Sequence, residues 1–186
     1  MENLQHLAVW YDSHLWKHPL CTKTVTAMAL YFLGDVASQR FSYLTKPRRT
    51  RGEYEFDVKR TLRMVCWATL ITTPNSIWYG FLDDNVEGDG PYAVLTKVLV
   101  DQLVYSPPTA LTFFICNDLM LGKSVLESAH EATQKIMPVL RVNWIVWPML
   151  HLVTFTMVTL KYRVLWINVC SLGWSCFLSR RAAAAP

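Results

Sequence analysis

Apolar residues along the chain are grouped into long segments that are separated by short polar connections. Four of these segments approach the roughly 20 residues that a helix needs to cross about 30 Å of hydrocarbon, and a fifth is shorter. They cover about residues 20–41, 61–83, 93–116, 143–160 and 163–179. The pattern predicts an all-α protein: a single integral membrane domain over residues 1–186, built as a helical bundle with four to five transmembrane helices.

A shorter amphipathic stretch precedes the first long segment. Its apolar side chains recur at helical spacing, at Leu4, Leu7, Ala8, Tyr11 and Leu15. This helix should end at His18, because the residue before a proline, here Pro19, is biased away from helical geometry. We expect an N-terminal amphipathic helix that either lies in the membrane interface or packs on the bundle. The stretch contains Glu2 and Asp12 but no Arg, unlike an Arg-rich, acid-poor transit peptide.

Polar side chains form a stripe along one face of three of the predicted membrane helices. The stripe of the first helix spans an arc of about 100° and contains Thr24, Tyr31, Asp35, Ser38, Gln39 and Ser42. The stripe of the third spans roughly 80° and contains Lys97, Asp101, Tyr105, Pro108 and Thr112, with Gln102 on its flank. The stripe of the fourth contains Asn143, Trp147, His151, Thr154 and Val158. The opposite, lipid-facing side of the first helix contains Ala29, Leu30, Leu33, Val36 and Ala37.

Together the stripes predict one polar seam inside the bundle. Its candidate residues are Asp35, Gln39, Lys97, Asp101, Gln102 and His151. Inserting an ionisable side chain into a membrane costs about 2.5 to 3.5 kcal/mol, so buried ionisable residues in the seam are expected to have a structural or functional role. Either hydrogen bonds across helices hold the packing together, or the seam is a wet pathway whose carboxylates select and pass small solutes. Both interpretations bury and pair Asp35, and Lys97 lies one turn from Asp101, where the two can neutralise each other.

Three prolines are predicted to break these helices. Pro74 lies in the middle of the second apolar segment, and Pro107 and Pro108 interrupt the third. Each proline removes a backbone donor and bends its helix. Such breaks either shape a bundle statically or, as in many transport proteins, mark a cavity and its gate.

The connections between the segments differ in charge. Residues 40–63 are rich in Lys and Arg, whereas LDDNVEGDG at residues 82–90 has four acidic residues and no basic one. The positive-inside tendency places the basic connection on the inner side and the acidic one opposite, and Arg180 and Arg181 return to the basic side if the fifth segment spans. The basic side chains are either solvated or bind anionic lipid headgroups. The candidates are Arg48, Arg49, Arg51, Lys59, Arg60 and Arg63.

Composition supports the membrane class and argues against others. Hydrophobic residues make up 52% of the 186 residues and charged residues only 17%, which is unusual for a soluble domain. The five cysteines form no CxxC pair or metal-ligand cluster, so we expect buried structural thiols and no metal. The chain contains no phosphate loop, dinucleotide fingerprint or catalytic motif. We therefore expect neither an enzyme nor a cofactor, and no direct nucleic-acid partner.

Short motifs in a fixed order resemble the Mpv/PMP/Sym family of small membrane proteins, almost from end to end. The first half contains Tyr11-xxx-Leu15-xx-His18-Pro19, Gly34-Asp35-xx-Ser38-Gln39, Asp57-xx-Arg60, Pro74-xxx-Trp78-Tyr79-xx-Leu82-Asp83, Lys97-xxx-Asp101-Gln102 and Pro107. The second half contains Trp144-xx-Trp147-Pro148, Phe155, Arg163, Trp174 and Phe177-Leu178-Ser179. Four residues depart from the family's usual pattern, namely His151, Thr154, Thr159 and Ser175. The family usually has Gln at the position of His151.

The resemblance implies a channel-like, multi-pass protein of the mitochondrial inner membrane, with a peroxisomal or plastid membrane as the alternative. We expect a solute pore or pore regulator that contributes to mitochondrial homeostasis, with Asp35 and Asp101 as selectivity charges and the proline breaks as gates. The alternative is a non-conducting accessory subunit of a large complex such as the respiratory chain or ATP synthase, for which outward-facing Trp67, Trp166 and Trp174 would be contacts. Expected partners are membrane lipids and either such a complex or further copies of the chain.

Overall fold

The computed structural model describes residues 2–44, 52–88 and 90–183, and these residues form helices and connections without a β-strand. The prediction of an all-α protein is therefore confirmed. The elements are α1 (Glu2–Lys17), α2 (Pro19–Leu44), α3 (Val58–Asn85), α4 (Pro91–Val100), the π-helical turn η2 (Asp101–Tyr105), α5 (Ser106–Met120), α6 (Val125–Met157) and α7 (Leu160–Ala183).

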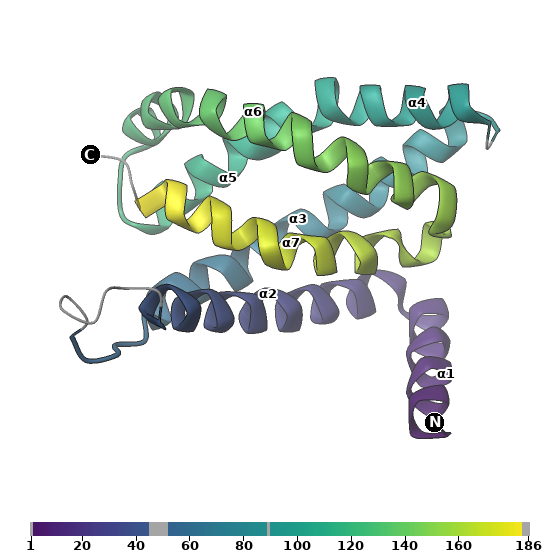
Figure 1. Ribbon diagram of the computed structural model, residues 1–186, viewed down its shortest axis with the longest axis horizontal. Coiled ribbons are helices and arrows are strands. Elements are labelled where there is room, and N and C mark those ends of the chain that lie inside the picture. The colour runs from purple at the N-terminus through teal and green to yellow at the C-terminus, as the bar shows by residue number, and fades with distance from the viewer. Residues whose placement is uncertain (1, 45–51, 89, 184–186) are drawn as a thin grey trace.

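Successive helices cross the molecule in alternating directions (Figure 1). The C-terminal ends of α2, α5 and α7 lie at the left of that view, and the C-terminal ends of α3 and α6 lie at the right. The basic start of α3 and the acidic connection after it therefore lie at opposite ends of the bundle, in the arrangement that the charge pattern predicts. Helix α1 stands across the end of α2 rather than along it.

Two stretches are long and apolar enough to cross a membrane by length and composition, namely Pro91–Met120 and Val125–Met157. The first combines α4, η2 and α5, and the second is α6. Helices α2, α3 and α7 have 26, 28 and 24 residues, which exceeds the length of a typical span, but they contain more charged and polar side chains.

Helix α6 is the element whose start differs most from the prediction. It begins at Val125 instead of about residue 143, because its first turns contain charged residues that hydropathy does not mark as membrane helix. Ser124 caps this helix by accepting a hydrogen bond from the Glu127 backbone N–H. Lys135 then donates to Asp118 at 3.1 Å, which attaches the polar first half of α6 to the end of α5.

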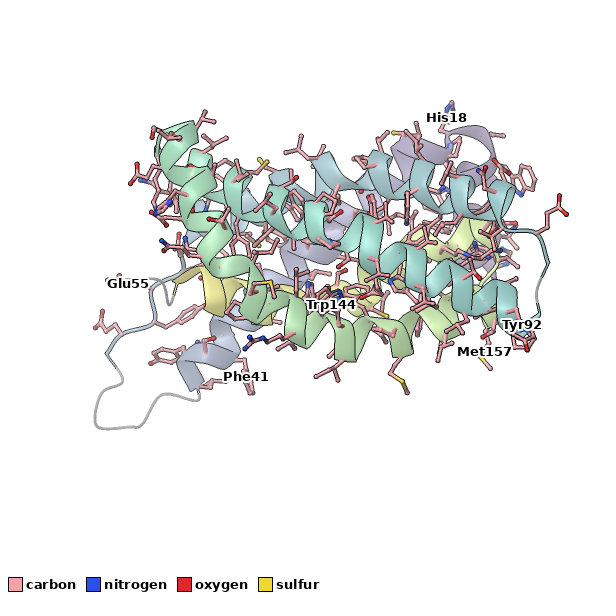
Figure 2. The ribbon with its side chains drawn as sticks, turned by 90° about the horizontal axis from the view of Figure 1, so that it is seen from above. His18, Phe41, Glu55, Tyr92, Trp144 and Met157 are labelled. Carbon is pink, nitrogen blue, oxygen red and sulfur yellow. The ribbon has the colours of Figure 1, made fainter. Side chains whose placement is uncertain are left out.

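Large apolar side chains cover the outside of the bundle. Figure 2 shows Phe41, Tyr92 and Met157 at the periphery, where they are 59%, 86% and 81% exposed. On the predicted lipid-facing side of α2, Leu33 is exposed, as are Ala29 and Ala37. Exposed apolar surface of this extent is unfavourable in water and is typical of a membrane or partner interface.

Helices α2 and α7 approach each other closely at Gly34. A Cβ atom at this position would lie 2.8 Å from Leu172 Cδ2 on α7. Small residues at such points let membrane helices pack tightly. The inner face of α2 that follows, with Asp35, Ser38 and Gln39, is thereby held against the bundle.

The π-helical turn changes the predicted polar face of the third segment. The Ser106 backbone N–H bonds the Asp101 carbonyl five residues earlier, one residue more than in an α-helix. The buried face therefore shifts after Tyr105, and Phe113, Phe114, Asn117 and Asp118 are buried. Pro108 and Thr112, which the regular 100° spacing places on the inner stripe, are exposed. That part of the stripe prediction is wrong.

The cysteines are less buried than expected. Cys21 and Cys66 are exposed on the outside of α2 and α3, and Cys116 and Cys170 are partly buried. All four are free thiols. The expectation of buried structural thiols is therefore wrong for Cys21 and Cys66.

Candidate functional site

A cavity of about 100 Å³ lies between the helices, and its lining residues come from α2, α3, η2, α5, α6 and α7. The lining residues fall near the middle of these helices, for example Tyr31 in α2, Ile71 in α3 and Ser171 in α7. On either side lie buried hydrophobic clusters, one around Phe114 and Met64 and the other around Leu82 and Val164. The cavity therefore lies at mid-length of the bundle, between two apolar layers.

Asp101 is the acidic residue of the cavity lining and is 3% exposed. Its Oδ1 atom accepts a 2.9 Å hydrogen bond from Trp78 Nε1, and its Oδ2 atom accepts one of 2.8 Å from Gln102 Nε2. His151 Nε2 lies 2.9 Å from the same Oδ2 atom. The carboxylate thus accepts from three side chains, two of them on other helices.

The prolines after η2 explain why a side chain, the indole of Trp144, bonds the backbone carbonyl of Gln102. In a π-helical turn the Gln102 carbonyl would accept from residue 107, but Pro107 has no N–H, and the Ser106 N–H already bonds Asp101. Trp144 Nε1 of α6 donates to the Gln102 carbonyl at 3.1 Å instead. The break predicted at Pro107 and Pro108 is therefore present as a π-helical turn, stabilised by an indole from a neighbouring helix.

A chain of amides continues from Asp101 to α6. The Gln102 side-chain oxygen accepts from Asn143 Nδ2 at 2.8 Å, and the same Asn143 nitrogen lies 2.7 Å from Ser106 Oγ. These contacts fix the amide orientation of Gln102, whose nitrogen then points to Asp101. The structure brings together three residues of the predicted seam, Asp101, Gln102 and His151.

Aromatic rings form much of the cavity wall. Tyr105 stacks on Trp78 with ring centroids 4.7 Å apart and donates its hydroxyl to Asn75 Oδ1 at 2.7 Å. Asn75 directly follows Pro74, the break predicted inside α3. The proline removes a bond of the helix at the level of the cavity, and the residues next to the two predicted break points, Asn75 and Ser106, line it.

Two buried polar atoms of the lining have no hydrogen-bond partner among the described residues. They are Trp147 Nε1 and His151 Nδ1, from side chains 8% and 2% exposed. Both residues are on α6, one turn apart, with ring centroids separated by 5.5 Å. Buried donors and acceptors are normally satisfied by protein, water or ligand, so these two atoms indicate an occupant of the cavity.

Lys97 pairs with a different residue from the one predicted. Its Nζ atom lies 2.9 Å from Asp83 Oδ1 on α3, and Arg163 Nη1 of α7 lies 2.6 Å from the same oxygen. The predicted pairing of Lys97 with Asp101 is therefore wrong. The charged cluster of Asp83, Lys97 and Arg163 forms near the acidic end of the bundle, and none of the three lines the cavity.

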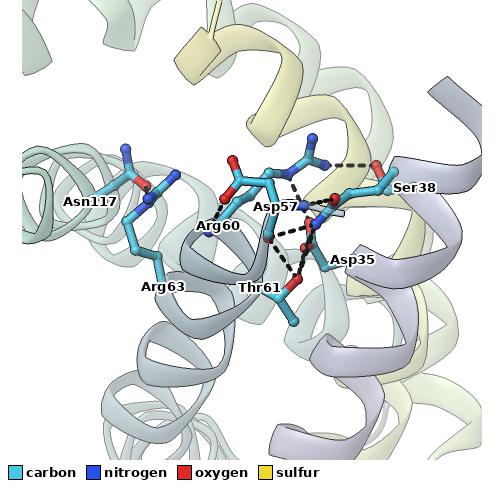
Figure 3. A network of polar contacts seen from close by, with 8 residues as sticks. Asp35, Ser38, Asp57, Arg60, Thr61, Arg63 and Asn117 are labelled. Carbon is cyan, nitrogen blue, oxygen red and sulfur yellow. Dashed lines mark hydrogen bonds and ion pairs between the residues drawn. The ribbon is translucent and has the colours of Figure 1, made fainter. Parts of the chain in front are cut away.

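Asp35 also lies apart from the cavity, in a network between α2 and α3 that Figure 3 shows. Asp35 Oδ1 accepts from Arg60 Nε at 2.9 Å, and Oδ2 accepts from Thr61 Oγ1 at 2.7 Å and Gln39 Nε2 at 2.8 Å. Gln39 also accepts from the backbone N–H of Asp57, the residue that caps α3. The predicted single seam is therefore divided, and Asp35 and Gln39 belong to a packing network.

The basic residues predicted to bind lipid headgroups differ in their surroundings. Arg60 pairs with Asp35, and Arg63 donates to Asn117 of α5 at 3.1 Å. Both guanidinium groups therefore already have partners on other helices of the bundle. Lys59 is exposed. Arg48, Arg49 and Arg51 lie outside the described residues.

Sequence reasoning missed several residues of these sites. Asn75, Ser106 and Arg163 received no site role, although the first follows a mid-helix proline and the second precedes a proline pair. Those positions mark where backbone bonds are lost and side chains replace them. Arg163 carried a sequence signal, since it is a charged residue at the very start of the fifth apolar segment and the fourth residue of α7.

Comparison with known proteins shows which family and which proteins the chain is similar to. Residues 118–179 match the Mpv17 / PMP22 family. The chain is 34% identical over 173 residues to Protein sym-1 of Neurospora crassa, covering 91% of this chain and 95% of that protein. It is 33% identical over 173 residues to Protein SYM1 of Gibberella zeae, covering 91% and 94%. PXMP2/4 family protein 2 of Dictyostelium discoideum is 29% identical over 170 residues, covering 91% and 87%.

The chain belongs to the Mpv17 / PMP22 family. This confirms the resemblance that the order of the motifs indicates. The segment that matches the Mpv17 / PMP22 family directly contains Asn143, Trp147 and His151, the contribution of α6 to the cavity. No solved structure matches the chain.

Proposed function

We propose that this Mpv17 / PMP22 family member is a channel-like pore for small solutes in the mitochondrial inner membrane, where it contributes to mitochondrial homeostasis. The observation that carries the proposal is the cavity at mid-length of the bundle, with a buried acid, a histidine and two unpartnered polar atoms. Packing alone does not account for all polar groups that border this space, because Trp147 Nε1 and His151 Nδ1 have no partner among the described residues. Sites at mid-depth, next to broken helices, are typical of transport proteins.

The proposal places α2, α3, α4–η2–α5, α6 and α7 across the bilayer. Each of these five passes exceeds roughly 20 residues and presents apolar side chains outward. Helix α1 would then lie in the headgroup region, since it stands across the end of α2 and exposes Trp10 and Trp16.

In this proposal the two apolar layers on either side of the cavity block the path, so the structure corresponds to a closed pore. Conduction would require these layers to separate, and η2 and Pro74 are the positions where a helix can bend with fewest backbone bonds to break. Asp101 lines this path and Asp35 does not, so Asp101 is the acid that we retain for a role in the pore.

The experiment is solute entry into proteoliposomes, measured by swelling. Unaltered protein should accelerate entry of small solutes, and Asp101→Asn should slow it, because the amide disturbs the contacts of Trp78, Gln102 and His151. The matched control is Asp84→Asn, which removes the same charge from an exposed side chain near the end of α3. Equal rates for empty liposomes and for liposomes with unaltered protein would refute the pore.

An accessory subunit of a larger complex is the alternative that the sequence left open, and it is less supported. Trp67 is buried, and Trp166 and Trp174 are partly buried, so they form no outward aromatic surface. Migration on a native gel after mild detergent extraction tests this alternative. A position near a monomer or small homo-oligomer would favour the pore, and co-migration with a megadalton-scale assembly would favour the subunit.

A further inference from the structure

The two unpartnered atoms of the cavity have complementary hydrogen-bonding character. Trp147 Nε1 is an indole N–H and can only donate. His151 Nε2 lies 2.9 Å from the Asp101 carboxylate, so Nε2 holds a hydrogen and donates it. In the neutral imidazole the remaining nitrogen, Nδ1, then has a lone pair and accepts. With His151 neutral, the cavity therefore offers one donor and one acceptor on the same face of α6.

Few chemical groups satisfy both atoms at once. An ammonium group has donors only and would leave the Trp147 N–H unpaired. A carboxylate or phosphate accepts only, would leave His151 Nδ1 unpaired, and would be repelled by Asp101. A hydroxyl group donates and accepts through one oxygen, so it can receive the indole N–H and donate to the imidazole.

The charge of the site also favours an uncharged ligand. Both oxygens of Asp101 already accept hydrogen bonds from Trp78, Gln102 and His151, so the carboxylate does not require a cationic ligand as its partner. Lys97 and Arg163 are engaged with Asp83 and do not line the cavity, so an anion would meet no free cation among the described lining residues.

The space exceeds a single water molecule. A water molecule has a share of roughly 30 Å³ in the liquid, compared with the cavity volume of about 100 Å³. Further polar side chains border the same space, among them Asn75, Ser106 and Ser171. A molecule with two or three hydroxyl groups would therefore find partners beyond the first pair, between aromatic walls that contact its carbon atoms.

We propose that the cavity is a binding site for a small uncharged solute with hydroxyl groups, one of which bridges Trp147 Nε1 and His151 Nδ1. The inference rests on the proposed function in one respect, that the bound solute belongs to the class that the pore passes. Trp147 and His151 would be the residues that determine this specificity, and Asp101 would position His151 by fixing which ring nitrogen holds the hydrogen.

The test is binding of glycerol to the full chain in detergent micelles, followed by the indole N–H signals of ¹⁵N-labelled tryptophan. Trp147→Phe assigns the Trp147 signal by its loss. We expect this signal to shift saturably with glycerol, and the signal of exposed Trp16 to change little. Tetramethylammonium chloride and sodium acetate should give no saturable shift. A Trp147 signal that is insensitive to glycerol, or saturable by either charged probe, would overturn the proposal.

A second measurement uses saturation transfer from the protein to glycerol, which needs no tryptophan signal. Trp147→Phe retains a ring and removes the donor, so glycerol should bind about three- to tenfold more weakly, which is the effect of one neutral hydrogen bond. Trp16→Phe is the matched control and should bind normally. Equal affinity of Trp147→Phe and unaltered protein would contradict the proposed bridge.

The binding and swelling experiments fail independently. Saturable glycerol binding without solute entry would retain the site and refute the pore. Solute entry without saturable glycerol binding would retain the pore and refute the hydroxyl site.

Discussion

Asp35 of α2 and Asp101 of η2 are both buried, 2% and 3% exposed, but their surroundings differ in how completely the neighbouring groups are paired. Asp35 has a guanidinium partner, Arg60, and every side chain around it in the described network is hydrogen-bonded. Asp101 has the imidazole of His151 and uncharged donors, and it borders a cavity with two unpartnered atoms. Complete pairing identifies a structural network, whereas incomplete pairing next to space identifies a candidate site.

The largest expected effect comes from breaking the network of Asp35. Asp35→Ala leaves the Arg60 guanidinium, which is 21% exposed, without its carboxylate, and removal of one partner of a buried pair costs about 3 to 5 kcal/mol. We expect a strong loss of folded protein on extraction and a lower unfolding temperature in detergent. Replacing both partners, in Asp35→Ala with Arg60→Met, should restore part of the stability. Asp84→Ala removes an exposed carboxylate and serves as the control.

A smaller effect is expected where a side chain replaces a backbone bond at η2. Trp144→Phe retains an aromatic ring but leaves the Gln102 carbonyl without its indole donor, which costs about 1 to 3 kcal/mol for an unsatisfied buried group. Thermal unfolding in detergent measures the loss, and Trp10→Phe on α1 is the control with an exposed indole. Unchanged stability would mean that the Gln102 carbonyl finds another donor.

Trp147→Phe should separate binding from stability. The indole N–H has no partner among the described residues, so Trp147→Phe breaks no hydrogen bond and should lower the free energy of unfolding only through the packing lost with the smaller ring, while it weakens glycerol binding. Unfolding and binding are measured on the same preparation. Lower stability with unchanged glycerol binding would show that Trp147 is only a packing residue.

The smallest effect concerns an exposed pair, Asp12 of α1 with α7. A hydrogen bond from Lys161, and a second from Tyr162, hold the pKa of Asp12 below its usual value of about 3.9. A folded pKa below the unfolded one stabilises the docking of α1 at pH values above about 4, and this contribution is lost as the pH falls through the folded pKa. Hydrogen-exchange protection of α1 should fall in that range, and Asp12→Asn should remove the pH dependence.

The inner face of α2 was predictable because this helix is regular. Spacing at 100° per residue places Tyr31, Asp35, Ser38 and Gln39 on one face, and all four are buried. The same rule loses register in the third segment, where the five-residue bond of η2 rotates the residues that follow. A pair of prolines signals a break in a sequence, but not which kind of turn forms before it.

The partners of charged residues were less predictable than their positions. Lys97 has a carboxylate one turn away in the chain, yet it bonds Asp83 across the short connection between α3 and α4. Spacing within one helix describes local pairs only, and interhelical pairs depend on packing that no local pattern encodes. For the same reason the cavity itself could not be predicted, since it requires side chains from α2, α3, α6 and α7.

The Asp35–Arg60 pair has a consequence for how the chain enters a bilayer. Insertion of α2 alone would place the Asp35 charge in hydrocarbon at about 2.5 to 3.5 kcal/mol. The compensating charge is on α3, the next helix, and Gln39 of α2 also bonds the backbone at the start of α3. The two helices can therefore partition as a self-neutralised hairpin before the rest of the bundle assembles, which makes α2–α3 the expected first unit of biogenesis.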